Sequence, residues 1–208
     1  MGSLTVCCPA PSAIDGCVLT GALNPCPADV GQIQKMIFWR NGNSISTISS
    51  AVDSTYWAAL VAITTGDTKA TVTPFVHNPD MPYGDAREFG GGNETRWGAP
   101  LRKGGTAPTF TFTMLAEDQD AITIMKGWRC EAMEVLFINE ANQLIYSSTS
   151  TCSGFPVIPN SFFVSDKKIG GLEDYDSNIM QFSLQPNWSD TLEISTATTF
   201  LLSLVNVS

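Results

Sequence analysis

The sequence predicts a mainly β protein of the α+β class, an antiparallel β-sandwich or barrel with one or two short flanking helices and a long inter-subunit loop. Short segments with two-residue alternation, or with continuous apolar character, recur along the chain between turns of hairpin length. Only two segments show helical spacing. Residues 78–107 follow neither period, which predicts a long loop.

The N-terminal segment differs in composition from the rest. Residues 1–34 contain only two charged side chains, Asp15 and Asp29, and four prolines interrupt any regular element. We therefore expect residues 1–30 to be an extended N-terminal arm. Residues 31–208 are expected to form a single β-rich domain that carries the long loop 78–107.

The first half of the domain supplies three kinds of signal. Residues 32–39 (QIQKMIFW) and 44–48, separated by an Asn-Gly-Asn turn, predict a hairpin. Asp53 is a good N-cap for a helix over residues 54–63, which ends before Gly66. Residues 69–76 alternate and predict a strand.

The clearest strand is residues 109–115 (TFTFTML), where Phe110, Phe112 and Met114 share one face and threonines the other. Acidic residues then precede a helical pattern that should end near Gly127.

Further strands are expected towards the C-terminus. Residues 133–139 and 143–148 predict a hairpin, and residues 179–184 predict a strand that returns along Phe162–Val164. The segment after Thr191 predicts either a strand pair or a short helix.

Charge restricts the classes of partner. The chain has 11 Lys and Arg against 20 Asp and Glu, a net charge of −9 and a pI near 4.4, which opposes binding to nucleic acid. The same sign suits a surface past which DNA slides. No apolar segment approaches the roughly 20 residues of a membrane span, and the first twenty residues lack signal-peptide features. We expect synthesis in the cytoplasm and no membrane partner.

The six cysteines do not predict a metal site. Four lie in the first 26 residues, at Cys7, Cys8, Cys17 and Cys26, without the close pairs typical of zinc ligands. Free thiols are expected in a reducing cytosol, and disulfide formation after release from a cell is the alternative.

No catalytic or cofactor site is expected. The glycine-rich stretch matches no phosphate-loop spacing, and His77 is the only histidine that could serve a nucleophile. The acidic cluster 117–120 is explained by helix capping, and the cluster 173–176 by a solvated turn.

The long loop combines aromatic side chains with much of the scarce positive charge, a composition typical of interfaces. An acidic body with one basic, aromatic loop is complementary to another copy of itself. The alternative is a long hairpin folded back on its own sheet. The predicted interface residues are Tyr83, Arg87, Phe89, Arg96, Trp97, Arg102 and Lys103.

The order of these blocks resembles a known family. NPCPADVGQIQKMIFWR, the helix and strand of residues 53–76, the glycine-rich loop, TFTFTMLAEDQDAITIMKGW and the segment from Ile158 to Asp190 are together similar to major tail tube proteins, virion structural proteins of tailed bacteriophages. The similarity spans nearly the whole chain and lies in layout.

This resemblance implies a β-sandwich or barrel with a flanking helix, present as six copies per ring in stacked rings. Sheets of neighbouring subunits would line a lumen through which DNA passes. Residues 80–105 and 1–30 would bridge subunits, and other virion proteins would be partners. It implies no enzymatic activity and no cofactor.

Two other classes stay open. A capsid decoration or head-tail joining protein would share the acidic β-rich character without forming tubes alone. A carbohydrate-binding module or hydrolase would show a concave patch of tryptophans, namely Trp39, Trp57, Trp97, Trp128 and Trp188, although helical placement of two of them favours core packing.

Overall fold

The computed structural model describes residues 30–43, 45, 48–63, 66, 68–148 and 152–205. The chain divides after Val30 into two units, Met1–Val30 and Gly31–Ser208, and all elements named below belong to the second. The predicted N-terminal arm and its four cysteines lie outside the described residues.

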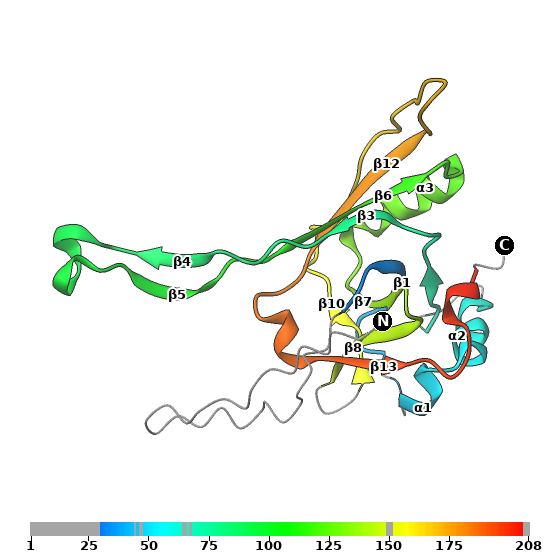
Figure 1. Ribbon diagram of the computed structural model, residues 1–208, viewed down its shortest axis with the longest axis horizontal. Coiled ribbons are helices and arrows are strands. Elements are labelled where there is room, and N and C mark those ends of the chain that lie inside the picture. Colours follow the sequence, from blue (N-terminus) through cyan, green and yellow to red (C-terminus); the bar gives the residue numbers. More distant parts are fainter. Residues whose placement is uncertain are drawn as a thin grey trace, which may run out of the picture. The chain divides into compact units, whose positions relative to one another are not determined.

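Two antiparallel sheets form the body of the Gly31–Ser208 unit, as the sequence predicted (Figure 1). The larger sheet has the order β13 (Leu192–Thr196), β8 (Gln143–Ser148), β7 (Met133–Asn139), β1 (Ile33–Arg40) and β2 (Thr71–Val72), with β9 (Cys152–Ser153) beside β8 and β10 (Phe155–Pro156) beside β7. The smaller sheet has the order β11 (Phe163–Val164), β12 (Ser177–Ser183), β6 (Thr109–Leu115) and β3 (His77–Asp80).

Aromatic side chains join the two sheets. The alternation predicted for β6 is confirmed, because Phe110, Phe112 and Met114 are buried while the threonines between them are half-buried. The Phe110 ring lies 5.4 Å from that of Phe137 on β7, and Phe182 on β12 lies 5.6 Å from Phe38 on β1. These edge-to-face and tilted contacts between sheets define one core.

A second core lies on the other face of the larger sheet, under α1 (Ile48–Ala51) and α2 (Ser54–Val61). The Trp39 and Trp57 rings lie 5.4 Å apart, and the Trp57 indole N–H donates to the Ala51 carbonyl at 2.7 Å. The larger sheet is therefore covered on both faces. This explains why every residue of β7 is buried, as a continuous apolar strand predicts.

Both predicted helices begin at the expected caps. The Asp53 carboxylate accepts the Thr55 N–H at 2.9 Å at the start of α2, and Asp118 caps α3 (Gln119–Gly127). Ile122 and Met125 are buried on the inner side of α3. The helix continues into a 3-10 turn, Trp128–Cys130, with the Trp128 ring 5.5 Å from Phe38.

Of the hairpin predicted between residues 32–39 and 44–48, residues 44, 46 and 47 lie outside the described residues, and the described neighbours of β1 are other strands. β1 pairs instead with β7 on one side and β2 on the other, and Ile48 begins α1. A strand that is apolar on both faces is stabilised most in the centre of a sheet, so β1 takes two distant neighbours. The strand predicted over 69–76 shortens to β2, because Pro74 has no N–H to continue the ladder.

The β7–β8 hairpin is confirmed, with Phe137 opposite Ile145. Its turn residue Asn142 has a φ of 57° and holds the C-terminal segment. Its amide donates to the Thr199 carbonyl at 2.8 Å and its Oδ1 accepts the Leu201 N–H at 2.8 Å. The C-terminal region contains both predicted alternatives in part, the strand β13 and a 3-10 turn, Leu201–Ser203.

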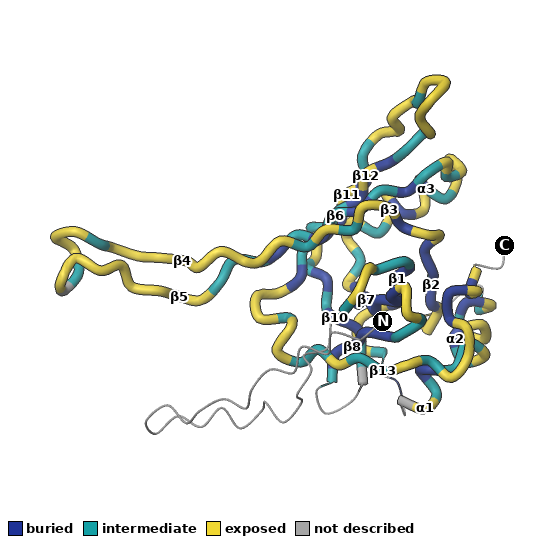
Figure 2. Tube along the Cα trace, in the orientation of Figure 1, coloured by how far each residue is buried: buried dark blue, intermediate teal, exposed yellow. Residues whose placement is uncertain are grey.

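Residues 78–107 are not a loop without secondary structure. β3 occupies their start, and β4 (Ala86–Phe89) pairs with β5 (Leu101–Gly105) in a separate two-stranded ribbon. This ribbon runs away from the two sheets, and its residues are almost all exposed (Figure 2). The alternative of a hairpin folded back on its own sheet is therefore also wrong.

Candidate assembly surface

The two-stranded ribbon and its turn, residues 84–105, are called the arm. Glu88 lies opposite Arg102, and Phe89 lies opposite Leu101. The Arg102 Nε lies 3.6 Å from the Glu88 Oε1, an exposed ion pair that adds little stability. Among the described residues the side chains of the arm are almost all exposed, including Phe89 and Leu101, and exposed apolar residues of this kind indicate a partner that covers them.

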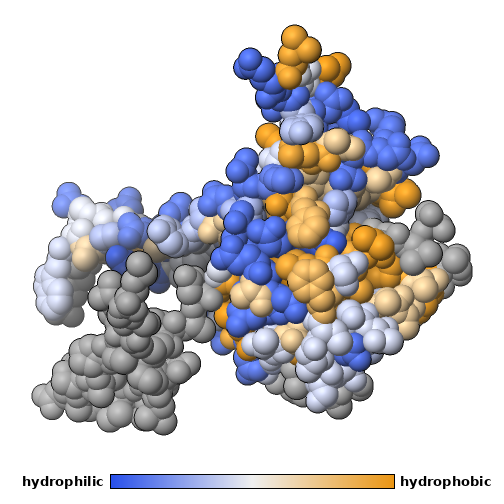
Figure 3. Space-filling model, turned by 45° about the vertical axis from the view of Figure 1, so that its right-hand side comes forward, coloured by the Kyte–Doolittle hydropathy of each residue, from blue (hydrophilic) through white to orange (hydrophobic). Residues whose placement is uncertain are grey.

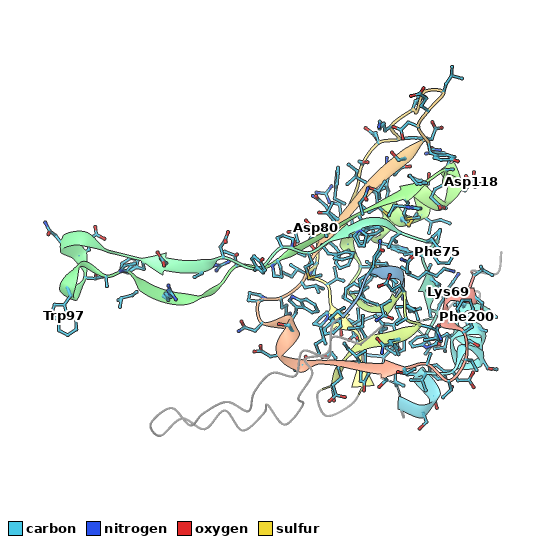
Figure 4. The ribbon with its side chains drawn as sticks, in the orientation of Figure 1. Lys69, Phe75, Asp80, Trp97, Asp118 and Phe200 are labelled. Carbon is cyan, nitrogen blue, oxygen red and sulfur yellow. The ribbon has the colours of Figure 1, made fainter. Side chains whose placement is uncertain are left out.

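The tip of the arm is a defined turn. Two 3-10 turns, Gly92–Glu94 and Arg96–Gly98, follow each other, and the Thr95 hydroxyl donates to the Ala99 carbonyl. Trp97 has a φ of 65°, a left-handed conformation that is costly for a bulky side chain. Its side chain is 91% exposed and lies at the far end of the arm (Figure 4). Strain at a solvent-exposed tryptophan indicates a functional constraint.

The base of the arm is closed by two hydrogen bonds between its strands. The Thr106 N–H donates to the Asp85 carbonyl at 2.8 Å, and the Asp85 N–H donates to the Thr106 hydroxyl at 2.8 Å. A Cβ on Gly84 would lie 2.3 Å from the Thr106 carbonyl oxygen. Glycine at this position allows the two chains to approach closely where the arm leaves the domain.

The structure places six of the seven predicted interface residues within the arm, and Tyr83 immediately before it. Tyr83 is 96% exposed and Phe89 is 57% exposed. Arg87 is exposed, and no described residue forms an ion pair with it. Arg96 and Lys103 lie on the arm by their backbone positions. Their common role in an interface stays a prediction.

A second surface is the outer face of the smaller sheet. Cross-strand partners share a face, so the half-buried Thr111 and Thr113 of β6 lie beside Gln181 and Ile179 of β12. On β3, His77 is opposite Thr113 and Asp80 is opposite Thr111. The face is thus mainly hydroxyl and amide groups, with one carboxylate at its edge.

A third surface is the hairpin that joins β11 to β12, residues 165–176. Ile169, Leu172 and Tyr175 are strongly exposed there. The turn is held by a Lys168–Asp174 ion pair and by the Gly170 N–H, which donates to the Asp176 carboxylate at 2.9 Å. The sequence prediction of a solvated acidic turn missed these apolar residues, although they alternate with the acidic ones.

The fourth surface is a groove of about 480 Å³. One wall is the end of α2 (Val61–Ile63), the other is α3 with Ile124, and Thr71–Pro74 lies between them. A hollow of about 460 Å³ shares Trp128 with the groove and continues it to the Arg40–Glu131 ion pair. Hydrophobic residues gather on the face that Figure 3 brings forward. These residues come from segments far apart in the sequence, which is why no local signal predicted the groove.

Glu117 is the carboxylate of the groove. Burial raises its pKa above the ordinary value, an effect that Lys167 opposes and Asp118 reinforces. The Lys167 ammonium donates to the Glu117 backbone carbonyl at 2.9 Å. Within the described residues, no hydrogen bond reaches the carboxylate oxygens themselves.

The five tryptophans do not share one concave patch. Trp57 is buried in the second core, Trp97 is on the arm, and Trp188 lies 5.1 Å from the Phe155 ring, so of the five only Trp39 and Trp128 line the same hollow. In the part of the chain that the structure describes, no three His, Cys, Asp or Glu residues could hold a metal ion, and no helix has the length and hydropathy to cross a bilayer. His77 is exposed on β3.

No protein-family model and no curated protein matches the chain. Three solved structures are similar in fold. The tail of an empty GTA particle with C6 symmetry has a TM-score of 0.34 and 11% identity over 60% of this chain and 88% of that one. The baseplate of the anti-feeding prophage (AFP) has a TM-score of 0.36 and 10% identity over 83% and 98%. The cap that terminates the AFP tube has a TM-score of 0.33 and 11% identity over 61% and 83%. All three TM-scores are below 0.5.

Proposed function

We propose that the chain is a structural protein of a phage virion whose copies assemble into the tail tube. The observation that carries the proposal is the arm, an exposed ribbon that ends in a strained tryptophan. An exposed, strained tryptophan raises the free energy of the isolated chain, and aromatic residues supply much of the binding energy of protein interfaces. The arm also holds four of the chain's 11 cationic residues and three of its 20 acidic ones, so it is complementary to the acidic body.

The smaller sheet supplies the lumen in this proposal. Its inner face is needed for the core, whereas its outer face presents mainly threonine, serine and glutamine, with the exposed Ile179 and Phe163 among them. Its edge strands β3 and β11 are short, and both leave one side without a strand partner among the described residues. Pairing of β11 of one copy with β3 of the next removes these edges and closes a ring.

Six copies per ring and stacked rings follow from the resemblance of the sequence to tail tube proteins. DNA passes such a lumen without specific binding, because hydroxyl groups offer no cation to the phosphates and the net charge of −9 repels them. The arm bridges one ring to the next. In this proposal the protein lies in the virion, next to other virion proteins.

Removal of residues 84–103 tests the proposal. The full-length protein should form tubes visible by negative-stain electron microscopy. The shortened protein should keep its circular dichroism spectrum, because the arm contributes no buried residue to either core. Tubes of unchanged length from the shortened protein refute the role of the arm.

A capsid decoration or head-tail joining protein is the second candidate, favoured by the apolar hairpin 165–176 as a separate contact surface. Such a protein forms closed rings or trimers and adds to a preformed shell. Rings that never stack, in the same electron micrographs, identify this class. The scattered tryptophans do not favour a carbohydrate-binding module.

A further inference from the structure

The groove between α2 and α3 is an exposed apolar surface on a part of the domain that the arm does not reach. Ile124 in its wall is 62% exposed, and Pro74 and Ala121 line it nearby. None of its lining residues belongs to the arm. An apolar hollow of this size is typical of a binding site and not of a plain surface.

We propose that this groove receives the tip of the arm of a second copy of the chain, with Trp97 seated between α2 and α3. The inference rests on the proposed function and names the acceptor that the arm requires. The occupant is a second copy, because the same chain supplies an exposed tryptophan at one end and, at another, an apolar slot that no side chain of the described residues fills.

The chemistry of the two surfaces is complementary. A tryptophan side chain presents an apolar ring and an indole N–H donor, and an apolar slot with a hydrogen-bond acceptor beside it is complementary to both. The slot is formed by Val61, Ile124 and Met125, and the acceptor is Glu117, whose carboxylate oxygens accept no hydrogen bond within the described residues. Because Glu117 is partly buried in the groove, a hydrogen bond from an incoming donor is stronger there than it would be in water.

The charges around the groove favour the arm. Asp118 and Asp120 are exposed at the start of α3, beside Glu117. Arg87 on the arm is exposed and forms no ion pair with a described residue. Lys69 in the groove carries the opposite sign, so the arm should orient its cations towards α3. Such complementarity fixes the register of docking and speeds encounter.

The placement of the two surfaces makes the contact head-to-tail. Trp97 lies at the far end of the arm, whereas Lys69 and Phe75 lie on the opposite side of the domain (Figure 4). One copy therefore cannot fill its own groove. Each docking event leaves a free groove on one copy and a free arm on the other, and a heterologous contact of this kind repeats.

Three full-length variants test the groove. Ile124→Arg blocks the acceptor and leaves the arm intact, and Trp97→Ala removes the anchor and leaves the groove intact. Thr123→Arg is the matched control, because it adds the same charge to the same helix at an exposed neighbouring position. Each blocked variant should raise the protein concentration needed for tubes by at least about 30-fold, and Thr123→Arg should not.

Mixing the two blocked variants gives a sharper result. When rings of each variant are formed separately and then mixed, the arms of an Ile124→Arg ring can still dock in the grooves of a Trp97→Ala ring, so one ring of each should pair and the pair should grow no further. Native mass spectrometry detects it. Neither variant alone should form this complex.

Photo-crosslinking identifies the acceptor directly. With p-benzoylphenylalanine at position 97, crosslinks should map to residues 61–63, 69–74 or 117–128 of another copy. The groove is not the acceptor if crosslinks are confined to residues 165–176, or if the Ile124→Arg variant assembles like the wild type. Neither of these results contradicts tube assembly itself. A wild-type chain that never assembles removes the proposed function itself.

Discussion

Glu134 on β7 connects three parts of the larger sheet, and its replacement gives the most informative stability test. Its Oε2 accepts the Trp39 indole N–H at 3.1 Å and the Gly154 N–H at 3.1 Å, and its Oε1 accepts the Gly42 N–H at 3.4 Å. Trp39 and Gly154 are buried, so Glu134→Ala leaves two donors without a partner. At about 1–3 kcal/mol per buried donor, we expect a loss of about 2–6 kcal/mol.

Glu134→Gln separates hydrogen bonding from charge. The amide oxygen can still accept from Trp39 and Gly154, and Gly42 is exposed to water. Burial raises the pKa of the Glu134 carboxyl, an effect that its hydrogen bonds from Gly42, Trp39 and Gly154 oppose. The charged form is thus disfavoured in the folded state. We expect Glu134→Gln to lie within about 1 kcal/mol of the wild type at pH 7.

The pH dependence has a defined sign. A carboxyl with a raised folded-state pKa contributes stability that is present below the unfolded value of 4.5 and is lost as pH rises through the folded value. The free energy of unfolding of the wild type should therefore rise relative to that of Glu134→Gln as pH falls from 7 towards 4.5. Urea unfolding, followed by tryptophan fluorescence at concentrations too low for assembly, measures both effects. A Glu134→Gln loss as large as that of Glu134→Ala refutes the reasoning.

Three other changes have defined outcomes. Gly84→Ala should redirect the arm, because its Cβ meets the Thr106 carbonyl at 2.3 Å; tubes should disappear from electron micrographs while circular dichroism is unchanged, and normal tubes contradict this. Asn142→Gly keeps the turn but loses the hydrogen bonds to Thr199 and Leu201, and should lower the free energy of unfolding in urea by about 1–3 kcal/mol. An unchanged urea midpoint contradicts the role of Asn142 in holding the C-terminal segment. Asp53→Ala should lower the thermal unfolding midpoint at neutral pH, because the hydrogen bond from the Thr55 N–H stabilises the ionised Asp53 carboxylate and lowers its pKa. The difference in midpoint between wild type and variant should shrink as pH falls below 3.8, where the carboxylate becomes protonated. A difference that does not change with pH contradicts the capping role of Asp53.

The elements that could be predicted are those with local signals. β6 alternates because one face is buried, α3 begins at a capping carboxylate, and β7 and β8 are joined by a short turn. The neighbours of β1 in the sheet could not be predicted, because β7 follows β1 by about a hundred residues. The sequence of a strand does not indicate which distant strand will pair with it.

The arm shows a different limit. Its composition predicted an interface, and its residues do lie together on one projection. Its strands were missed because neither face is buried, so no alternation is selected, and glycines occupy the end of β5. The groove was missed because α2, β2 and α3 each contribute only a few residues to it, all of which look like ordinary core or surface positions in sequence.

An arm on one side of the domain and a slot on the other give any stack of copies a direction. One end of such a stack displays Trp97 side chains and the other end displays grooves, so the two ends of the stack differ chemically. In the proposed tail tube, this difference lets each end join a different structure. Proteins that stop growth at the two extremities must then recognise different surfaces, although both surfaces belong to the same chain.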